Sequence, residues 1–515
     1  MPELSEEHPI RLLETKLEES SAIIDKPLQE SWTFLDAFDW RLYNSDFTLV
    51  YNGNALILYT LPHGVEIARS PVSTLPRFGC DLPPGPLAET LRPILSIRAL
   101  TPLAQTRIVK RSYRLLDKRK KTVARLLVLE AYPPEDMETI VGAYIQIDPI
   151  RGYKKQAQKW RKKLKIAKSA RQFDRFYTDI LAHEGKKPGD YSNKLNLSLR
   201  PDMRADEAVK YIFRRLLAIA RANEHCIQED IDSECLHDFR VALRKTRSLL
   251  TQTRGVFPPD VTERFRKDLR DVMSVTNELR DLDVYLLDEP RYRSLIAQTE
   301  MQDALTPVFD YLRTRRSEAL ERVRTEIASE RYAEIITDWR TFIESPSPKK
   351  PPKDAPRAAM SILTLAQARI YKRYRRMLKD GRAALASGDP KDLHALRIDG
   401  KKLRYLLEFF QSLLPPKKGR KLITLTKKLQ TNLGTFNDLT VQQDYLLHIA
   451  GELPVDDATA KRALMAVGML AEALARQRDD VQAEFGDIFA RFSSAKTQAL
   501  VSEICGRKGK QGGNS

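Results

Sequence analysis

The sequence predicts an α+β domain followed by an all-α domain that contains two copies of one helical unit. Three observations lead to this prediction. β-rich runs and most of the proline and glycine punctuation lie before about residue 150, long amphipathic helices follow from about residue 204, and one helical motif occurs twice. A chain of 515 residues also exceeds what one hydrophobic core usually organises, so two or three domains are expected.

The first part of the chain has the pattern of antiparallel strands. FTLVYNGNALILYTL carries β-rich runs on both sides of Gly53, which predicts a hairpin, and TVARLLVLEAY is a further β-rich run. We place the α+β domain at 1–190 and a linker at 191–203. Residues 151–171 contain no acidic residue, which fits a solvated helix or a phosphate-facing patch about equally well.

The second part has the 3.6-residue period of amphipathic helices. We place the helical domain at 204–495, with lobes at 204–343 and 357–495. The Pro/Ser/Lys-rich stretch 344–356 cannot be helical and links the lobes. The polar tail 506–515 is predicted to be disordered.

The two lobes repeat one motif. LHDFRVALRKTR, residues 236–247, aligns without a gap with LHALRIDGKKLR, residues 393–404. The same register aligns LRDLDV at 279–284 with FNDLTV at 436–441, which predicts a second repeated helix start. Upstream, IFRRLLAIAR resembles RYRRMLKDGR after a change in loop length. We therefore predict a pseudo-symmetric pair of helical bundles.

Each copy of the motif places basic side chains on one helix face, where like charges three or four positions apart repel one another. A solvated face is the simpler explanation, but it does not require the same order of residues twice. A dense anion would remove the repulsion, and arginine, lysine and histidine all bind phosphate oxygens. The residues predicted to line a shared cleft are His237, Arg240, Arg244, Lys245, Arg247, His394, Arg397, Lys401, Lys402 and Arg404, with Arg214, Arg215, Arg375 and Arg376 as further wall residues.

Two acidic residues, Asp281 and Asp438, could be read as general acids. Each follows a break in the pattern and begins an apolar run, so we interpret them as helix caps or as partners that hold a basic side chain in place. We assign no catalytic residue. The sequence also lacks a Walker-type phosphate loop, a dinucleotide fingerprint and a nucleophile elbow.

Composition favours a polyanionic partner in a reducing compartment. The formal charge of +18 fits nucleic acid, an anionic membrane surface or inorganic phosphate polymers. Four sparse cysteines, with no signal-peptide pattern and no apolar run that could span a bilayer, predict a soluble cytoplasmic protein. His225, Cys226, Cys235 and His237 match no familiar zinc spacing, so we predict no metal there and expect Cys226 to be buried in a helical core.

The paired motifs LHDFRVALRKTRSLL…LRDLDV and LHALRIDGKKLRYLLEFF…LGTFNDLTV closely resemble the two halves of a CHAD domain, the conserved-histidine α-helical domain, over residues 204–490. The resemblance implies two bundles, mostly four-helix units, around a basic central pore. It further implies binding of inorganic polyphosphate, sometimes at polyphosphate granules with their associated proteins. No enzymatic activity is generally implied for this domain.

The first 150 to 190 residues resemble a divergent CYTH domain, the antiparallel β-barrel that hydrolyses triphosphates with a divalent metal. The family's Glu-x-Glu-x-Lys strand would correspond to LLETKL, where Leu12 replaces the first carboxylate while Glu14 and Lys16 remain, and its Asp-Thr corresponds to Asp36-Ala37. Because a hard metal ion needs several oxygen ligands, the fold is expected to persist without the reaction. The basic residues that could still bind a phosphate chain are Arg98, Arg107, Arg111 and Lys118.

The sequence leaves three alternatives beside polyphosphate binding. The N-terminal domain could be a triphosphatase that uses Mg²⁺ or Mn²⁺, the only cofactors we consider. The basic faces could bind nucleic acid, although no helix-turn-helix, RRM or zinc-finger pattern is present. Finally, the chain could be a scaffold whose N-terminal domain docks proteins at granules.

Overall fold

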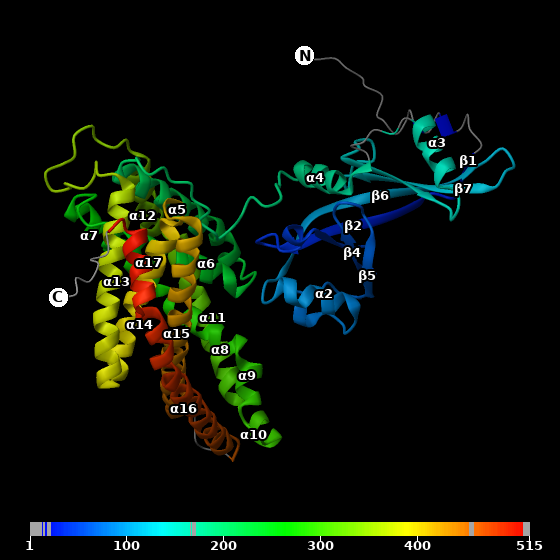
Figure 1. Ribbon diagram of the computed structural model, residues 1–515. Helices are drawn as coiled ribbons and strands as arrows, with labels where there is room; N and C mark the ends of the chain where they lie inside the picture. Colours follow the sequence, from blue (N-terminus) through cyan, green and yellow to red (C-terminus); the bar gives the residue numbers. More distant parts are fainter. Residues whose placement is uncertain are drawn as a thin grey trace. The chain divides into compact units, whose positions relative to one another are not determined.

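The computed structural model describes residues 13, 16–17, 22–164, 166, 171–452 and 458–507 (Figure 1). The chain divides into two compact units, Met1–Asn193 and Lys194–Ser515. The first contains an antiparallel sheet and the second is helical, so the predicted fold classes are confirmed. Most of the tail predicted to be disordered lies outside the described residues. No helix within the described ranges is long and apolar enough to cross a membrane.

The first unit is built on one eight-stranded antiparallel sheet with the order β5-β4-β3-β2-β6-β7-β8, in which β1 also pairs with β6. Its strands are β1 (Ala22–Ile24), β2 (Leu28–Ala37), β3 (Phe47–Tyr51), β4 (Ala55–Thr60), β5 (Glu66–Pro71), β6 (Leu100–Leu116), β7 (Thr122–Tyr132) and β8 (Gly142–Pro149). The predicted hairpin is confirmed, because β3 and β4 pair around Gly53, whose positive φ of 93° suits glycine.

Among the described residues, the helices that pack against this sheet include α2 (Pro86–Leu95), α3 (Lys154–Leu164) and α4 (Phe173–His183), with the short 3-10 helices η1 (Tyr43–Ser45) and η2 (Gly79–Asp81) in its loops. Leucines of α2 and apolar residues of α3 bury two separate clusters against the strands. On α4, the ring of Tyr177 lies 5.6 Å from that of Phe34 on β2. The likeness to a CYTH domain stays a prediction.

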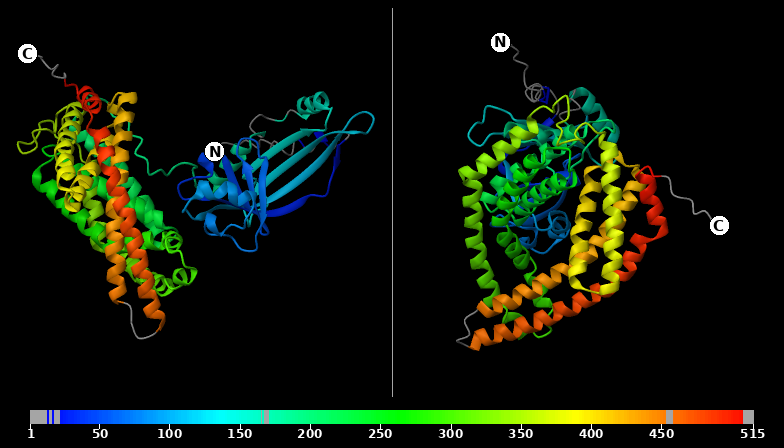
Figure 2. Two further views of the ribbon diagram at one scale, coloured as in Figure 1. Left: turned by 60° about the horizontal axis from the view of Figure 1, so that its bottom comes forward. Right: turned by 90° about the vertical axis from the view of Figure 1, so that its left-hand side faces the viewer.

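The second unit is a bundle of helices on either side of an irregular linker. Its helices are α5 (Ala205–Gln228), α6 (Ser233–Gln252), α7 (Pro259–Val275), α8 (Asn277–Leu287), α9 (Glu289–Ser294), α10 (Thr299–Asp303), α11 (Thr306–Ala328), α12 (Glu330–Glu344), α13 (Ile362–Ser387), α14 (Pro390–Phe409), η4 (Gln411–Leu413), α15 (Pro416–Glu452), α16 (Ala458–Ser493) and α17 (Ala495–Ile504). Figure 2 shows α15 and α16 as one long antiparallel hairpin.

The repeat extends further upstream than the sequence indicated. The starts of α5 and α13, Ala205 and Ile362, lie 157 positions apart, as do those of α6 and α14, Ser233 and Pro390. The two lobe entrances pair through a β-bridge between Arg204 and Ser361. The predicted change in loop length is therefore wrong, and the equivalent of Arg215 is Lys372 rather than Arg376. IFRRLLAIAR and RYRRMLKDGR resemble each other four positions out of register.

The lobes differ at the second motif. In the first lobe α7 ends at Val275 and α8 begins at Asn277, whereas in the second lobe the matching segment lies inside the continuous helix α15. Residues 436–441 are therefore not a helix start, and that prediction is wrong. The apolar run after Asp438 continues a helix that began two dozen residues earlier, which the short repeat could not indicate.

Candidate functional site

The ten strongest candidates lie on two equivalent helices. The first ridge is His237, Arg240, Arg244, Lys245 and Arg247 on α6, and the second ridge is His394, Arg397, Lys401, Lys402 and Arg404 on α14. The Asp232 carboxylate caps α6 by accepting from the backbone N–H groups of residues 234 and 235, and Asp389 caps α14 at residue 391. These matched starts bring the two ridges into equivalent register on their helices.

Arg240 is a structural residue of the first ridge. Its side chain is buried, and its guanidinium donates to the Met273 carbonyl at 3.1 Å, to the Thr276 hydroxyl and to Asn277 Oδ1 at 2.8 Å. These acceptors lie where α7 ends and α8 begins, and orphan carbonyls at a helix end need donors. Burial, followed by the nearby Arg244, lowers the pKa of Arg240. Arg240 therefore closes the junction between α7 and α8.

Its equivalent, Arg397, is held differently. Arg397 Nη2 donates to Asp438 Oδ1 at 2.9 Å, and the Asp438 side chain is 60% exposed. The neighbouring His394 places Nδ1 2.6 Å from Asn437 Oδ1. Pairing, one of our two interpretations of Asp438, is thus confirmed, whereas capping is wrong because the residue lies inside α15. An exposed carboxylate is a partner that a phosphate group could replace.

Asp281 lies inside α8 and does not cap it. Burial raises the pKa of Asp281, whereas Arg240 and Arg280 lower it. Asp438 also raises this pKa, so the two equivalent aspartates interact electrostatically. The repeated second motifs therefore meet between the lobes. Tyr285, one turn further along α8, stacks on Tyr445 of α15 with ring centroids 4.6 Å apart.

The two ridge helices contact each other near their C-terminal halves. Gln252 Nε2 donates to the Lys402 carbonyl at 3.2 Å, and Lys245 Nζ lies 2.9 Å from Glu408 Oε2. Within this contact the later residue of α6 meets the earlier residue of α14, and the earlier residue of α6 meets the later one of α14. The contact brings parts of the two ridges together.

Lys401 and Arg244 are the ridge residues that converge most clearly. Burial lowers the pKa of Lys401 to about 8, with further lowering by Arg397, then Arg244, and later Arg404. Asp438 opposes this shift. Among the described residues, the buried Nε of Arg244 has no hydrogen-bond partner. Cations of both lobes therefore build up positive potential here, which Asp438 partly offsets.

Two other ridge residues, Arg247 and Arg404, have partners outside this convergence. Arg247 Nη1 contacts Met273 Sδ at 3.7 Å, and burial together with Arg266 and Arg270 lowers its pKa, so it faces α7. Arg404 Nε donates to Glu408 Oε1 at 2.6 Å. Glu408 thus holds Arg404 as well as Lys245, which leaves less of their charge for a ligand.

Four further cations missed by the sequence reasoning gather beside Lys402 and Arg376. A pocket of about 310 Å³ opens where the end of α6 meets α13 and α14, and it is lined by Thr251, Gln252, Arg254, Arg369, Lys372, Arg373, Arg376 and Lys402. The signal was available, because Arg369, Lys372, Arg373 and Arg376 follow the three-and-four spacing of one helix face. Of the other predicted wall residues, Arg214 and Arg375 are exposed and Arg215 is half-buried.

The N-terminal candidates have different surroundings. Arg98 is buried beside Asp39, Arg111 pairs with the buried Glu130, and Arg107 and Lys118 are exposed. Leu12 and Glu14, on which the expected loss of metal binding rests, lie outside the described residues.

Asp36, another residue of the CYTH-like pattern, is bound by backbone N–H groups. Its carboxylate accepts from the N–H groups of Ala37, Leu42 and Tyr43 at 2.6, 2.8 and 2.9 Å. Burial nevertheless raises its pKa to about 7. A carboxylate surrounded by three backbone donors shapes a turn and is poorly placed to hold a metal ion.

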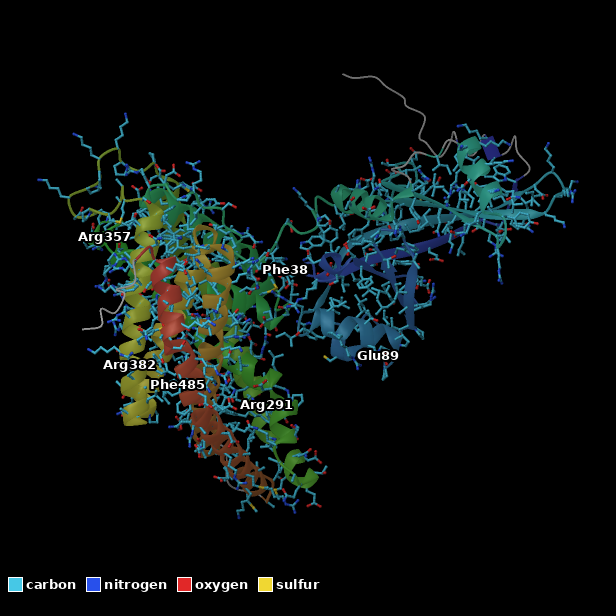
Figure 3. All side chains as sticks on the ribbon, in the orientation of Figure 1. Phe38, Glu89, Arg291, Arg357, Arg382 and Phe485 are labelled. Atoms are coloured by element: carbon cyan, nitrogen blue, oxygen red, sulfur yellow. A yellow bond between two sulfur atoms is a disulfide. The ribbon has the colours of Figure 1, made fainter. Side chains whose placement is uncertain are left out.

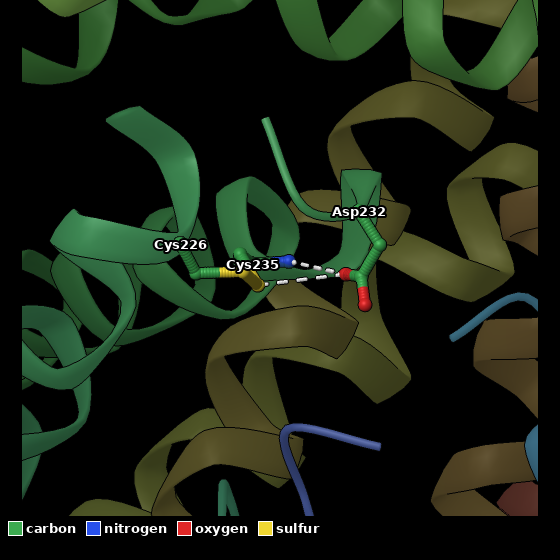
Figure 4. Close-up of side chains that lie close together, drawn as sticks. All are labelled: Cys226, Asp232 and Cys235. Carbon is green, nitrogen blue, oxygen red and sulfur yellow. Dashed lines mark hydrogen bonds between the residues drawn. A yellow bond between two sulfur atoms is a disulfide. The ribbon is translucent and has the colours of Figure 1, made fainter. Parts of the chain in front are cut away.

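Cys226 and Cys235 form a disulfide between the end of α5 and the start of α6 (Figure 4). The expectation that sparse cysteines stay reduced is wrong for this pair, because the turn between the helices brings together residues nine positions apart. Both are buried, as predicted for Cys226. Asp232 completes a group with ligand atoms within 4.8 Å of one another, but sulfur atoms joined to each other are not thiolate ligands.

Comparison with known proteins bears on the helical unit. The family model described as CHAD domain matches residues 211–447. The crystal structure of the CHAD domain from the plant Ricinus communis is 24% identical, covering 59% of this chain and 98% of its own with a TM-score of 0.49. PptA from Streptomyces chartreusis is 16% identical, covering 56% of this chain and 99% of its own with a TM-score of 0.42. No curated protein matches the sequence.

Proposed function

Residues 211–447 form a CHAD domain, and from this premise we propose that the helical unit binds inorganic polyphosphate along the face where α6 and α14 converge. The observation that carries the proposal is the environment of Lys401, whose pKa falls to about 8 beside arginines of both lobes. A cluster of like charges is unfavourable alone and becomes favourable when an anion joins it. A linear phosphate chain supplies one negative charge per unit and could contact both lobes.

The convergent residues are proposed to have different roles. Arg244 and Lys401 would contact the chain directly, and Arg397 would exchange Asp438 for a phosphate oxygen. His394 would add a donor at the end of the second ridge. Arg240 supports the face through its bonds to the α7–α8 junction and is not proposed as a contact. Binding of the protein to polyphosphate granules would follow from the same contacts.

The test is a titration of the full chain with long-chain polyphosphate by isothermal calorimetry. We expect Arg244→Gln combined with Lys401→Gln to weaken binding about tenfold or more, because each removes a charge-assisted contact. The affinity should also fall with rising salt, with a smaller slope for the variant. The matched control is Lys461→Gln with Arg462→Gln, two exposed cations on α16. Equal affinities of the two double variants would contradict the proposal.

Nucleic acid is the competing ligand. Basic residues interleave with aromatic ones at 210–217 and 371–376, where Phe213 and Tyr374 are 0% and 1% exposed and cannot stack on bases, whereas Tyr211 is 39% exposed. A competition experiment therefore has to separate the two ligands. In competition, we expect polyphosphate to displace a labelled oligonucleotide at a far lower phosphate concentration than the reverse. The opposite order would favour nucleic acid as the ligand.

A further inference from the structure

The residues that line the pocket between α6, α13 and α14 are more strongly basic than those of an ordinary solvated helix face. Six of its eight lining residues are cations and none is acidic. Two carboxylates pair with these cations. Asp399 is buried and lies 2.8 Å from both Arg373 and Arg376 and 3.2 Å from Lys402, and Asp380 lies 3.2 Å from Arg376. Six cations against two carboxylates still leave a positive excess at the wall.

Arg369 adds positive charge beside Arg254. It is half-buried and donates to the backbone carbonyl of Arg254 at 2.7 Å, a bond that does not neutralise its charge. Burial lowers the pKa of Arg369, as do Arg357, Arg254 and Arg373. A concave wall that holds arginines this close is unfavourable unless an anion occupies it.

The three pocket arginines of α13 have apolar equivalents in the other lobe. Counting 157 positions back along the chain from Arg369, Arg373 and Arg376 gives Ile212, Leu216 and Ile219, all buried. The two pocket lysines, Lys372 and Lys402, correspond instead to the cations Arg215 and Lys245. The pseudo-symmetric fold therefore does not require arginines at these three positions, because the equivalent helix packs with aliphatic side chains there.

We propose that this pocket binds a compact phosphate oligomer of two or three phosphate groups. Its volume of about 310 Å³ corresponds to about ten water molecules in the liquid, which matches the nine heavy atoms of diphosphate. Arginine forks and a lysine ammonium suit phosphate oxygens, and the charge of a diphosphate offsets much of the excess. The ligand is either a free diphosphate or triphosphate or the end of a polyphosphate chain, and the second form rests on the function proposed above.

The experiment titrates the full chain with diphosphate, tripolyphosphate and orthophosphate. We expect diphosphate and tripolyphosphate to bind with one site per chain and orthophosphate to bind more weakly. Arg369→Gln combined with Lys372→Gln should weaken diphosphate binding about tenfold or more. The control is Lys379→Gln with Arg382→Gln, an exposed pair with the same spacing on the same helix (Figure 3). Arg254→Gln, beyond the end of α6, changes one exposed pocket residue and guards against misfolding of the double variant.

Saturation with long-chain polyphosphate separates the two sources of the ligand. If the chain end enters the pocket, diphosphate no longer binds; if free ligand alone enters, diphosphate still binds with its original affinity. The proposal is overturned if diphosphate does not bind the wild-type chain, or if the pocket and control variants bind it equally well. Neither result affects the long-chain titration of Arg244 and Lys401, so failure here is distinguishable from failure of the polyphosphate-binding proposal.

Discussion

Raising the pH from 7 to 9 should weaken polyphosphate binding about tenfold through the loss of one proton from Lys401. With a pKa of about 8 in the free protein, Lys401 is about nine-tenths protonated at pH 7 and about one-tenth protonated at pH 9. A polyanion binds the protonated form and raises its pKa. If that form alone binds, the apparent Kd rises by about tenfold over this interval, which corresponds to about 1.4 kcal/mol.

Raising the pH changes folding stability in the opposite direction to polyphosphate binding. The folded pKa lies below the ordinary value of 10.5, so the unfolded chain binds more protons between these values. Lys401 therefore makes the folded state more stable as the pH rises from about 8 to 10.5, and weaker binding at pH 9 cannot be attributed to unfolding at this residue.

The assay is calorimetry with long chains, in which end groups contribute little, at constant ionic strength and at half-unit steps of pH. Lys401→Arg keeps the charge at all these pH values, so its affinity should change less than about twofold. Titration in buffers of different ionisation enthalpy should reveal proton uptake near pH 8 that disappears in the variant. A wild-type affinity that stays constant from pH 7 to 9, or a variant that retains the full decline, would refute this reasoning.

Three further outcomes are expected. Arg240→Ala should lower the free energy of unfolding by about 2–4 kcal/mol in urea, since it removes the hydrogen bonds of a buried guanidinium at the junction of α7 and α8, whereas Arg397→Ala should cost less than about 1 kcal/mol. Equal losses would contradict their different environments. Reducing the Cys226–Cys235 disulfide should lower unfolding free energy by about 2–3 kcal/mol from loop entropy, with Cys226→Ala as the reference that dithiothreitol should not affect. The full chain with tripolyphosphate and Mg²⁺ or Mn²⁺ should release no phosphate above the protein-free blank, because Asp36 is held by backbone amides. Steady phosphate release would instead support the triphosphatase alternative.

Local patterns in the sequence were sufficient for much of the fold. The hairpin around Gly53 and the run that became β7 could be predicted because alternation and turn chemistry act between neighbours. The basic ridges could be found for the same reason. The contact between α6 and α14 could only be inferred from the duplication, because it joins residues some 150 positions apart.

The errors arose where tertiary packing overrides local pattern. Arg240 and Arg397 have the same place in the repeat, yet one is buried at a helix junction and the other pairs with an exposed carboxylate. Cys226 meets Cys235 only because α5 and α6 form a hairpin of helices. The sequence predicts Arg375 and Arg376 as wall residues, whereas the pocket uses Arg369, Lys372, Arg373 and Arg376, because tertiary contact with α6 and α14 decides which face of α13 lines it.

Arg240 and Arg397 occupy equivalent positions in the repeat, but the break between α7 and α8 gives them different roles. A chain that lost Arg240 would spend more time unfolded, and the cell would keep less of it. A chain that lost Arg397 would accumulate to normal amounts and differ only in what it captures. Inherited changes at these two places should therefore be distinguishable by protein abundance alone, before any ligand is added.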